Sequence, residues 1–548
     1  MNKRFTMLVA IATIFTGGIK STACTNLLVG KKASSDGSVI ISYAADSHTL
    51  YGELYRWPAA VWPKGTMLDV AEWDTGKHLG QIRQAEQTFS VIGNMNEYQV
   101  AITETTWGGR EELVDTTGII DYGSLIYIAL QRSKTAREAI RTMTDLVAEY
   151  GYHSSGESFS IADKNEAWIM EMIGKGPGNK GAVWVAIRIP DDCIAAHANQ
   201  ARIQQIPFND KDNCMYSPDV VKLARDKGFF NGADKDFSFA KAYNPYDFGG
   251  LRGCEARVWS FFRKYDKTMD KYSDFIKGDA SKSPMPLYIK PDRKLSVQDV
   301  QQNMRDHYEG TDLDMTIDAG AGPYKVPYRW RPMHFKVDGK TYLNERAIAT
   351  QQTGFVIVPQ MRNWLPDEIG GILWFGVDDA DMAVFTPLYS SILASPECFR
   401  VGNGDMYNFS WTSAFWIHNW VANMAYSKYS FMIQDIRKVQ QELENGFKTT
   451  LPAIDKAAQE LLTQSPVEAR RFLTWFSTTT ADKATERWKQ LGEYLLVKYI
   501  DGNVKKEQNG QFQRNPYGQP AYPDFPGYDD SYYRSIVNSA GERLEVKE

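Results

Sequence analysis

Short apolar runs separated by turn residues dominate the N-terminal half of the chain, a pattern that predicts β-strands. Residues 25–46 contain two such runs on either side of Asp36-Gly37, a dipeptide typical of a hairpin turn. Three further pairs of runs predict antiparallel hairpins in the segments 91–105, 158–173 and 182–203. The first half of the chain therefore predicts antiparallel sheet.

Helical periodicity interrupts this pattern and returns near the C-terminus. Apolar residues recur at helical spacing over 122–150, which predicts two helices with a break near Ser133. The same spacing recurs over 411–443 and in three pieces of 453–500. Strands, then helices, then strands again predict an α+β fold in which layers of antiparallel sheet and helix are stacked.

Composition and pattern divide the chain into four parts. These are a leader over 1–23, a main body over 24–400, a helical layer over 401–502 and a tail over 503–548. The tail is rich in Pro, Gly and Tyr, so we expect irregular structure there.

The leader has the three-part layout of a secretory signal peptide. A basic "MNKR" is followed by an apolar run over 5–19, which is too short to span a bilayer. Ser21 and Ala23 occupy the small-residue positions of a cleavage site, so cleavage is expected directly before Cys24. The sequence thus predicts an exported protein, periplasmic or secreted, whose mature chain begins with cysteine.

Bulk composition agrees with an exported globular protein. The 548 residues are 43% hydrophobic, and the formal net charge of −5 gives no reason to expect nucleic acid or an anionic membrane as a partner. Five cysteines leave at least one thiol free if pairing is intramolecular. Cys24 is the candidate for that thiol, while Cys193 with Cys214, or Cys254 with Cys398, can pair in an oxidising compartment.

Several common catalytic motifs are absent from the sequence. There is no H-E-x-x-H, C-x-x-C, G-x-S-x-G or Walker motif, and the seven histidines show no metal-ligand spacing. A Cys-His pair formed in space stays open. The acidic stretch 309–318 lacks the ligand order of a calcium loop and is interpreted as a solvated loop. No metal or cofactor is expected.

Three interpretations of Cys24 compete: a buried core thiol, a site of lipid attachment, and a catalytic nucleophile exposed by cleavage. A cysteine placed by chance directly after a cleavage site is uncommon, which weighs against the core thiol. Ser21 stands where lipoproteins carry a larger aliphatic residue, and a strand follows at once without a polar tether. As a nucleophile, Cys24 needs no histidine, because its own α-amine can accept the thiol proton.

Residues 24–47, "CTNLLVGKKASSDGSVIISYAADS", resemble the mature N-terminus of the dipeptidase A-like cysteine peptidases. These peptidases are relatives of penicillin V acylase and bile salt hydrolase among the N-terminal-nucleophile hydrolases. The resemblance runs from Cys24 through the helical C-terminal region. It implies a four-layer αββα fold with a catalytic domain over 24–400 and hydrolysis of dipeptides through a thioester acyl-enzyme.

The same resemblance implies five site residues. Cys24 is the nucleophile, Asp46 in "AADS" lies against the terminal amine and thiol, and Asn96 in "GNMNE" helps to form the oxyanion hole. Asn199 in "HANQARI" is a second active-site asparagine, and Arg257 in "GCEARVWSFF" lies near the nucleophile. Taken singly, the last four also fit ordinary turn or helix-surface residues.

One position departs from the acylase-like relatives, and two other functions stay open. Tyr43 stands where those relatives carry arginine, so no fixed charge is available there to lower the thiol pKa. Within the same fold, N-acyl amides are an alternative to small peptides as substrates. From another class, a lipoprotein acylated at Cys24 that binds glycans or peptides without catalysis is favoured only by the aromatic content of 13%.

Overall fold

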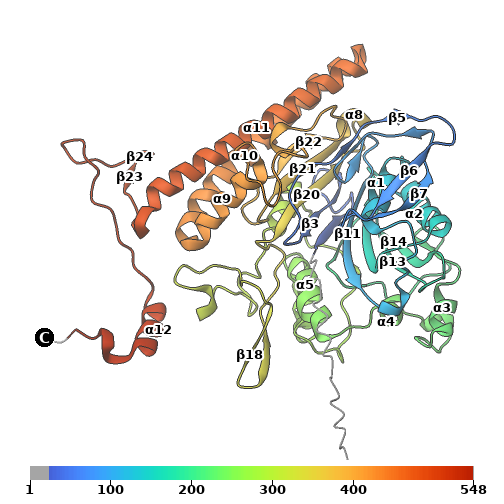
Figure 1. Cartoon of the computed structure of the whole chain (residues 1–548), viewed down its shortest axis with the longest axis horizontal. Coiled ribbons are helices and arrows are strands. Elements are labelled where there is room, and N and C mark those ends of the chain that lie inside the picture. The colour runs from blue at the N-terminus through green and yellow to red at the C-terminus, as the bar shows by residue number, and fades with distance from the viewer. Residues whose placement is uncertain (1–23, 547–548) are drawn as a thin grey trace, which may run out of the picture.

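Two eight-stranded antiparallel sheets, stacked face to face, form the centre of the protein (Figure 1). The computed structural model describes residues 24–546, and the signal peptide expected over 1–23 lies outside them. Helices cover the outer face of each sheet, so the layers follow the order helix, sheet, sheet, helix. The α+β class with a C-terminal helical region is therefore confirmed.

The first sheet carries the strand that follows Cys24 and the strand that ends at Asp46. All of its strand pairs are antiparallel, and β3 pairs with β20 beside the main order. In spatial order its strands are β17 (Tyr288–Ile289), β15 (Ile194–His197), β1 (Asn26–Val29), β2 (Val39–Ile41), β20 (Thr353–Met361), β21 (Gly371–Val377) and β22 (Thr386–Tyr389), with β3 (Tyr43–Asp46).

The second sheet contains the longer hairpin strands of the N-terminal half. Its strands in spatial order are β16 (Cys214–Tyr216), β14 (Ala182–Ile189), β13 (Ala167–Gly174), β12 (Gly156–Ala162), β11 (Ala101–Gly108), β10 (Met95–Asn96), β9 (Val91–Ile92) and β4 (Arg56–Trp57). Contacts of β1 with β11 and of β2 with β12 join the two sheets. Most side chains on the inner faces of both sheets are apolar, and burial of these faces is the main stabilising term of the fold.

The helix pair expected over 122–150 is confirmed. α1 (Tyr122–Leu130) and α2 (Ala136–Tyr150) pack on the outer face of the second sheet. The side chain of Thr135 caps α2 by accepting from the amide of Glu138 at 3.2 Å. The chain therefore breaks near Ser133, and α2 begins as a separate, capped helix.

The C-terminal helices pack on the outer face of the first sheet. They are α9 (Ala414–Ser427), α10 (Tyr429–Gln464) and α11 (Pro466–Tyr499), and the two long helices form an antiparallel pair along one side of the molecule (Figure 1). α5 (Ala256–Arg263) and α7 (Val297–Asn303) cover the rest of this face. No helix within 24–546 combines the length and the apolar character needed to cross a membrane.

The prediction of a hairpin over 182–203 is wrong. β14 pairs with β13 and β16 in the second sheet, whereas β15 pairs with β1 in the first sheet, so the turn at 190–192 carries the chain from one sheet to the other. A turn signal predicts that the chain changes direction and does not identify the partner of the next strand. The crossing matters because it places Asn199 beside the first residues of β1.

The remaining elements are short or lie at the edges. They are the helices α3 (Val220–Asp226), α4 (Phe239–Tyr243), α6 (Ser273–Ile276), α8 (Asp367–Gly370) and α12 (Asp530–Ala540), and the hairpins β5 (Ala60–Val61) with β8 (Gln87–Thr88), β6 (Met67–Ala71) with β7 (His78–Arg83), β18 (His334–Val337) with β19 (Lys340–Leu343), and β23 (Glu507–Gln508) with β24 (Gln511–Phe512).

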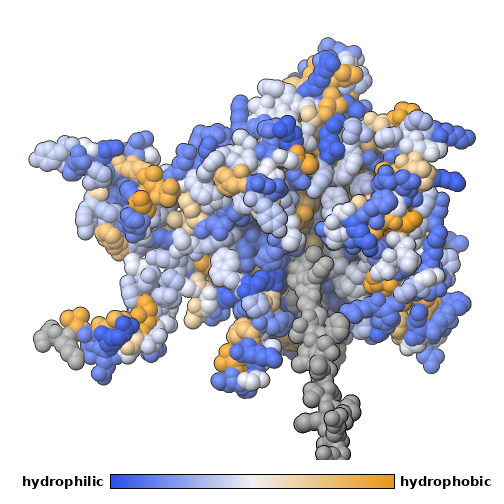
Figure 2. Space-filling model, in the orientation of Figure 1, coloured by the Kyte–Doolittle hydropathy of each residue, from blue (hydrophilic) through white to orange (hydrophobic). Residues whose placement is uncertain are grey.

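The C-terminal tail extends away from the layered body as an irregular arm that ends in α12 (Figure 1). The arm carries the short β23–β24 hairpin, and the side chain of Asp529 caps α12. The face seen in Figure 2 is largely hydrophilic, with apolar side chains scattered over it.

Candidate active site

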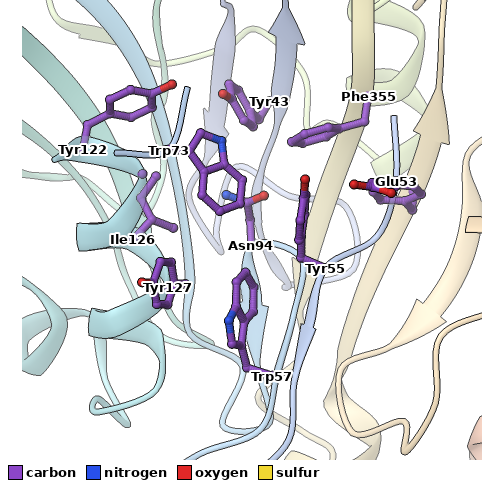
Figure 3. Close-up of a pocket in the computed structure, with 13 residues that line it drawn as sticks. Tyr43, Glu53, Tyr55, Trp57, Trp73, Asn94, Tyr122, Ile126, Tyr127 and Phe355 are labelled. Atoms are coloured by element: carbon purple, nitrogen blue, oxygen red, sulfur yellow. The ribbon is translucent and has the colours of Figure 1, made fainter. Parts of the chain in front are cut away.

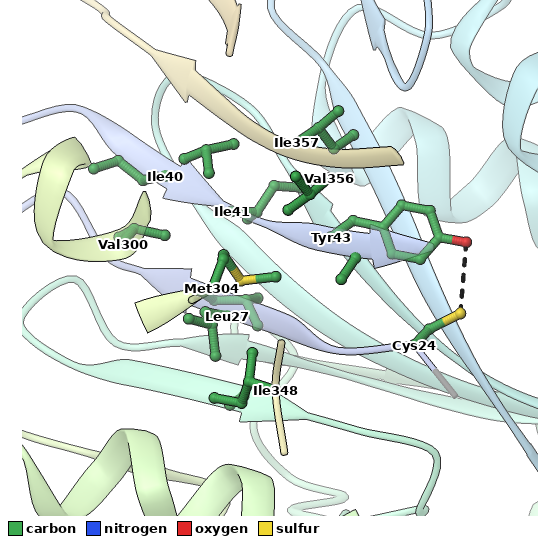
Figure 4. Close-up of a cluster of buried hydrophobic side chains, with 14 of the residues drawn as sticks. Cys24, Leu27, Ile40, Ile41, Tyr43, Val300, Met304, Ile348, Val356 and Ile357 are labelled. Atoms are coloured by element: carbon green, nitrogen blue, oxygen red, sulfur yellow. Dashed lines mark hydrogen bonds between the residues drawn. The ribbon is translucent and has the colours of Figure 1, made fainter. Parts of the chain in front are cut away.

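Cys24 lies immediately before β1, at the end of the buried space between the sheets. It is 5% exposed, and its sulfur points away from a cluster of apolar side chains toward Tyr43 (Figure 4). Leu27 and Ile41 of that cluster fix the two strands that flank the cysteine. The backbone around the thiol is therefore held by core packing.

The thiol contacts a phenol and a carboxyl group. The sulfur of Cys24 lies 3.8 Å from the hydroxyl of Tyr43 and 3.7 Å from Oε1 of Glu104. Tyr43 in turn donates to Glu104 Oε1 at 2.5 Å. Burial raises the pKa of the Cys24 thiol well above its usual value, and the nearby charges of Glu104 and Asp46 raise it further. The thiol at rest is therefore neutral.

Glu104 forms a buried pair with Glu157. Neither carboxyl group is more than 1% exposed, and burial raises the pKa of Glu104 to about 7. Burial and the charge of Glu104 raise the pKa of Glu157 well above its usual value. Near neutral pH this pair is therefore only partly ionised and carries at most one negative charge, located beside the thiol.

Arg257 connects three of the expected site residues. It lies in α5, directly after a π-helical stretch over 250–255, and is 1% exposed. Its guanidinium group donates to the carbonyl oxygen of Cys24 at 2.6 Å, to Thr25 Oγ1 at 2.8 Å and to Asn199 Oδ1 at 3.0 Å. The structure thus brings Cys24, Asn199 and Arg257 together, and Arg257 holds the backbone of the cysteine.

Asn199 has a left-handed backbone with φ of 60°, a conformation that asparagine tolerates better than most residues. Its amide group donates to the carbonyl oxygen of Thr106 at 2.6 Å while its oxygen accepts from Arg257. Asn199 therefore bridges the two sheets and orients the arginine.

Asp46 ends β3 and is completely enclosed. It forms an ion pair with Arg346 and accepts from Thr353 Oγ1 at 2.6 Å. Its backbone amide hydrogen-bonds to the Cys24 sulfur and favours the thiolate, in opposition to burial. Asp46 is therefore adjacent to the cysteine, and Arg346 is a further charged residue of the site.

Asn96 is not placed to stabilise an oxyanion, because its amide hydrogens are both used. It donates to the carbonyl oxygens of Leu130 and Ser133 at 2.8 and 2.7 Å, and its oxygen accepts from two backbone amides. Asn96 therefore joins its own turn to the end of α1. Two residues earlier, the side chain of Asn94 donates one amide hydrogen to the carbonyl oxygen of Ile102 at 2.9 Å. The second amide hydrogen of Asn94 has no acceptor among the described residues.

An aromatic pocket opens beside the site (Figure 3). Tyr43 and Asn94 line it together with side chains from the β3–β4 connection, α1, β20 and β21. Because Tyr43 contacts the Cys24 sulfur with its hydroxyl and the pocket with its ring, the pocket ends next to the thiol.

The histidines take no part in this geometry. His197 is buried between the sheets, where it bonds to Thr105 Oγ1 and Ser160 Oγ at 2.7 and 2.8 Å, and burial lowers its pKa to about 3. None of the seven histidines, all described, hydrogen-bonds to Cys24. Within 24–546 no group of three or more His, Cys, Asp or Glu residues is arranged to hold a metal ion.

All five cysteines are free thiols in the structure, so neither of the two disulfides considered from sequence is formed. Four functional candidates were not identified from sequence. Glu104 stands in the strand run "AITETT", where an acid at a buried position is an available signal, whereas Asn94, Glu157 and Arg346 carry none that a single sequence reveals.

A thiol at the head of an inner strand, enclosed by polar groups and adjacent to an aromatic pocket, indicates a cysteine-type hydrolase of the αββα class. Comparison with known proteins specifies it further: the chain belongs to peptidase family C69, whose family model matches residues 23–442.

Curated relatives agree with this membership. The chain is 27% identical over 475 residues to the "Probable dipeptidase" of Latilactobacillus sakei, covering 84% of this chain and 92% of the relative. It is 26% identical to the "Probable dipeptidase" of Salmonella dublin, with 70% and 84% covered, and 24% identical to "Dipeptidase A" of Lactobacillus helveticus, with 78% and 86% covered.

Proposed function

We propose that this protein is an exported cysteine dipeptidase whose mature chain begins at Cys24. The observation that carries the proposal is the position of the Cys24 thiol, which lies beside the aromatic pocket on a backbone held by Arg257. Membership of family C69 and the names of the relatives support peptide hydrolysis, with dipeptides as the substrates.

In the proposed reaction the Cys24 sulfur attacks the carbonyl carbon of the peptide bond. The thiol proton passes to the free α-amine of Cys24, whose ordinary pKa is about 7.7 to 8.0. The amine gives this proton to the leaving nitrogen as the C–N bond breaks, which leaves a thioester on Cys24, and water then hydrolyses the thioester. A base is necessary because burial keeps the resting thiol protonated.

The oxyanion of the tetrahedral intermediate requires donors that point into the pocket. We assign this role to Asn94, whose second amide hydrogen is not used by the fold, together with backbone amides. Arg257, Asn199 and Asp46 act as positioning residues around the cysteine. Asn96 has no direct role in this scheme.

Cleavage before Cys24 is the activating event in this proposal, because an amide nitrogen in the precursor cannot accept the proton. The intact mass of protein exported by a bacterial host, with N-terminal sequencing, tests it. A free unmodified Cys24 as first residue supports the proposal. An acylated cysteine removes the base and supports the lipoprotein alternative.

The Cys24→Ser variant tests the nucleophile. Serine keeps the amine but has a far less acidic hydroxyl group, so dipeptide turnover is expected to fall by roughly three orders of magnitude or more, with unchanged thermal unfolding. Cys193→Ser is the matched control, since Cys193 is also a buried free thiol but contacts Asp192 and not the site. Full activity of Cys24→Ser would rule out the proposed function.

A further inference from the structure

We infer that the aromatic pocket selects the N-terminal residue of the substrate by a free α-ammonium group and a large apolar side chain, with Glu53 as the counter-ion of the ammonium group. The inference rests on the proposed function and identifies the substrate class of the same site. It separates dipeptides from N-acyl amides, which lack the ammonium charge.

The charges around the pocket favour a cation. Of the thirteen residues that line it, the single ionic one is Glu53, and within 24–546 no lysine or arginine forms an ion pair with it. Glu53 accepts from the backbone amide of Gly402 at 3.1 Å, and its carboxylate lies beside the hydroxyl of Tyr55 (Figure 3). A half-buried carboxylate without a cation is a site for a charged ligand group.

Further negative charge lies behind the other walls. Tyr122, across the pocket from Glu53 in Figure 3, donates to Asp74 at 2.9 Å. Tyr43, between them, donates to Glu104. Both phenols donate to carboxyl groups, so acidic residues lie behind two further walls of the pocket, whereas no basic residue of the described chain lines it.

The remaining surface of the pocket suits an aromatic side chain. Eight of the thirteen lining residues are aromatic, and Trp57 stacks on Tyr127 with ring centroids 4.9 Å apart and planes inclined by 7°. Aromatic faces stabilise both an apolar side chain and an adjacent ammonium group. Gly and Ala leave this surface uncovered, so Phe, Tyr, Trp and Leu are the expected N-terminal residues.

The position of the thiol assigns the pocket to the N-terminal residue. The carbonyl carbon that the sulfur attacks is bonded to an α-carbon that also carries the ammonium group and the side chain. Because Tyr43 contacts the sulfur and also lines the pocket, a carbonyl at Cys24 places that α-carbon at the Tyr43 end of the pocket, and its two groups extend from there toward the other lining residues.

The test compares kcat/KM of the mature protein for Phe-Ala, its deamino analogue 3-phenylpropionyl-Ala, and Gly-Ala. We expect Phe-Ala to be preferred over the deamino analogue by roughly 10- to 100-fold, the range for a hydrogen-bonded charge. In Glu53→Gln this ratio is expected to fall toward one. Glu86→Gln, which removes an exposed acid that does not line the pocket, is the matched control and keeps the ratio.

Equal rates for Phe-Ala and its deamino analogue would overturn the inference and leave the proposed function supported. Hydrolysis of neither would overturn both. Binding supplies a second readout that needs no turnover: Cys24→Ser is expected to bind 2-phenylethylamine more tightly than 3-phenylpropionate, and the opposite order would overturn the inference.

Discussion

Tyr43 contacts the Cys24 thiol, and its hydrogen bond lowers the pKa of that thiol by less than burial raises it. It stands where the acylase-like relatives carry a positive charge, yet it brings a neutral phenol that holds Glu104 at 2.5 Å. Burial and the Glu104 charge therefore raise the pKa of the Cys24 thiol, and no arginine at this position opposes them. In the proposed reaction, activation therefore depends on proton transfer at the moment of attack and not on a preformed thiolate.

Glu104→Gln is predicted to make the thiol more acidic. Glutamine retains an acceptor for the Tyr43 hydroxyl but removes the charge that raises the pKa of Cys24. The rate at which iodoacetamide alkylates Cys24, measured against pH, should reach its half-maximum at lower pH than in the unchanged protein. Glu86→Gln should leave the curve in place, and an unmoved curve for Glu104→Gln would contradict the assigned electrostatics.

Substitution of Asn94 is predicted to lower activity, whereas substitution of Asn96 is predicted to lower stability. Asn94→Ala removes the proposed oxyanion donor and should lower kcat by roughly 10²- to 10³-fold with little change in stability. Asn96→Ala leaves two carbonyl oxygens and two amides without partners and should lower the free energy of unfolding by roughly 1–3 kcal/mol or more. Steady-state kinetics and urea unfolding of both variants check this, and a reversed pattern would restore Asn96 as the donor.

At the scale of elements, the β3–β4 connection forms one wall of the aromatic pocket. The position of this wall depends on the close approach of the connection to β20. A Cβ added to Gly52 would lie 2.1 Å from the carbonyl oxygen of Gly354, so only glycine fits at position 52, directly before Glu53. The strand order of the first sheet thus fixes where Glu53 enters the pocket.

Gly52→Ala is predicted to lower stability by roughly 1–3 kcal/mol and to raise KM, because the connection must move away from β20 and take Glu53 with it. Gly446→Ala is the matched control: it lies inside α10, a Cβ there meets no atom within 4 Å, and alanine should stabilise the helix by about 0.5–1 kcal/mol. Thermal unfolding and dipeptide kinetics of the two variants give the comparison. Equal free energies of unfolding for the two variants would contradict this prediction, because they would show that β20 can move to accommodate the added Cβ without loss of stability.

Buried acids govern the stability of the whole molecule near neutral pH. Burial raises the pKa of Asp378 and Glu171 to about 8 and of Glu104 to about 7, so the folded chain binds more protons than the unfolded chain between pH 6.5 and 8. The free energy of unfolding must therefore fall as pH rises through this window. The buried His197 and His418, whose pKa burial lowers to about 3, act in the opposite sense but only below about pH 6.5.

Urea unfolding of the mature protein should give a lower free energy of unfolding at pH 8 than at pH 6.5. In Asp378→Asn the difference between the two pH values should be smaller. Asp378 Oδ2 is buried without a hydrogen-bond partner among the described residues, while Oδ1 accepts from Asn419 at 2.9 Å. Asparagine also tolerates the φ of 64° at this position. Stability that rises between the two pH values would contradict the assignment.

Local patterns in the sequence determined much of the fold. The β1–β2 hairpin and the α1–α2 pair follow from apolar periodicity and turn residues, because each pairs neighbouring segments of chain. The motif at Cys24 identified the family because the cysteine, its strand and Asp46 lie within one short segment. The signal peptide and its cleavage site stay predictions from the sequence.

The tertiary structure alone decided which distant segments meet. Asn94 and Asn96 are equivalent candidates in sequence, and only the carbonyl groups at the end of α1 show that Asn96 is used by the fold. β15 pairs with β1 and not with β14, the strand that precedes it in sequence. Strand pairing depends on the burial of whole sheet faces, which no local sequence pattern encodes. For the same reason Glu53 and Arg346 became site residues only when strands far apart in the chain were brought together.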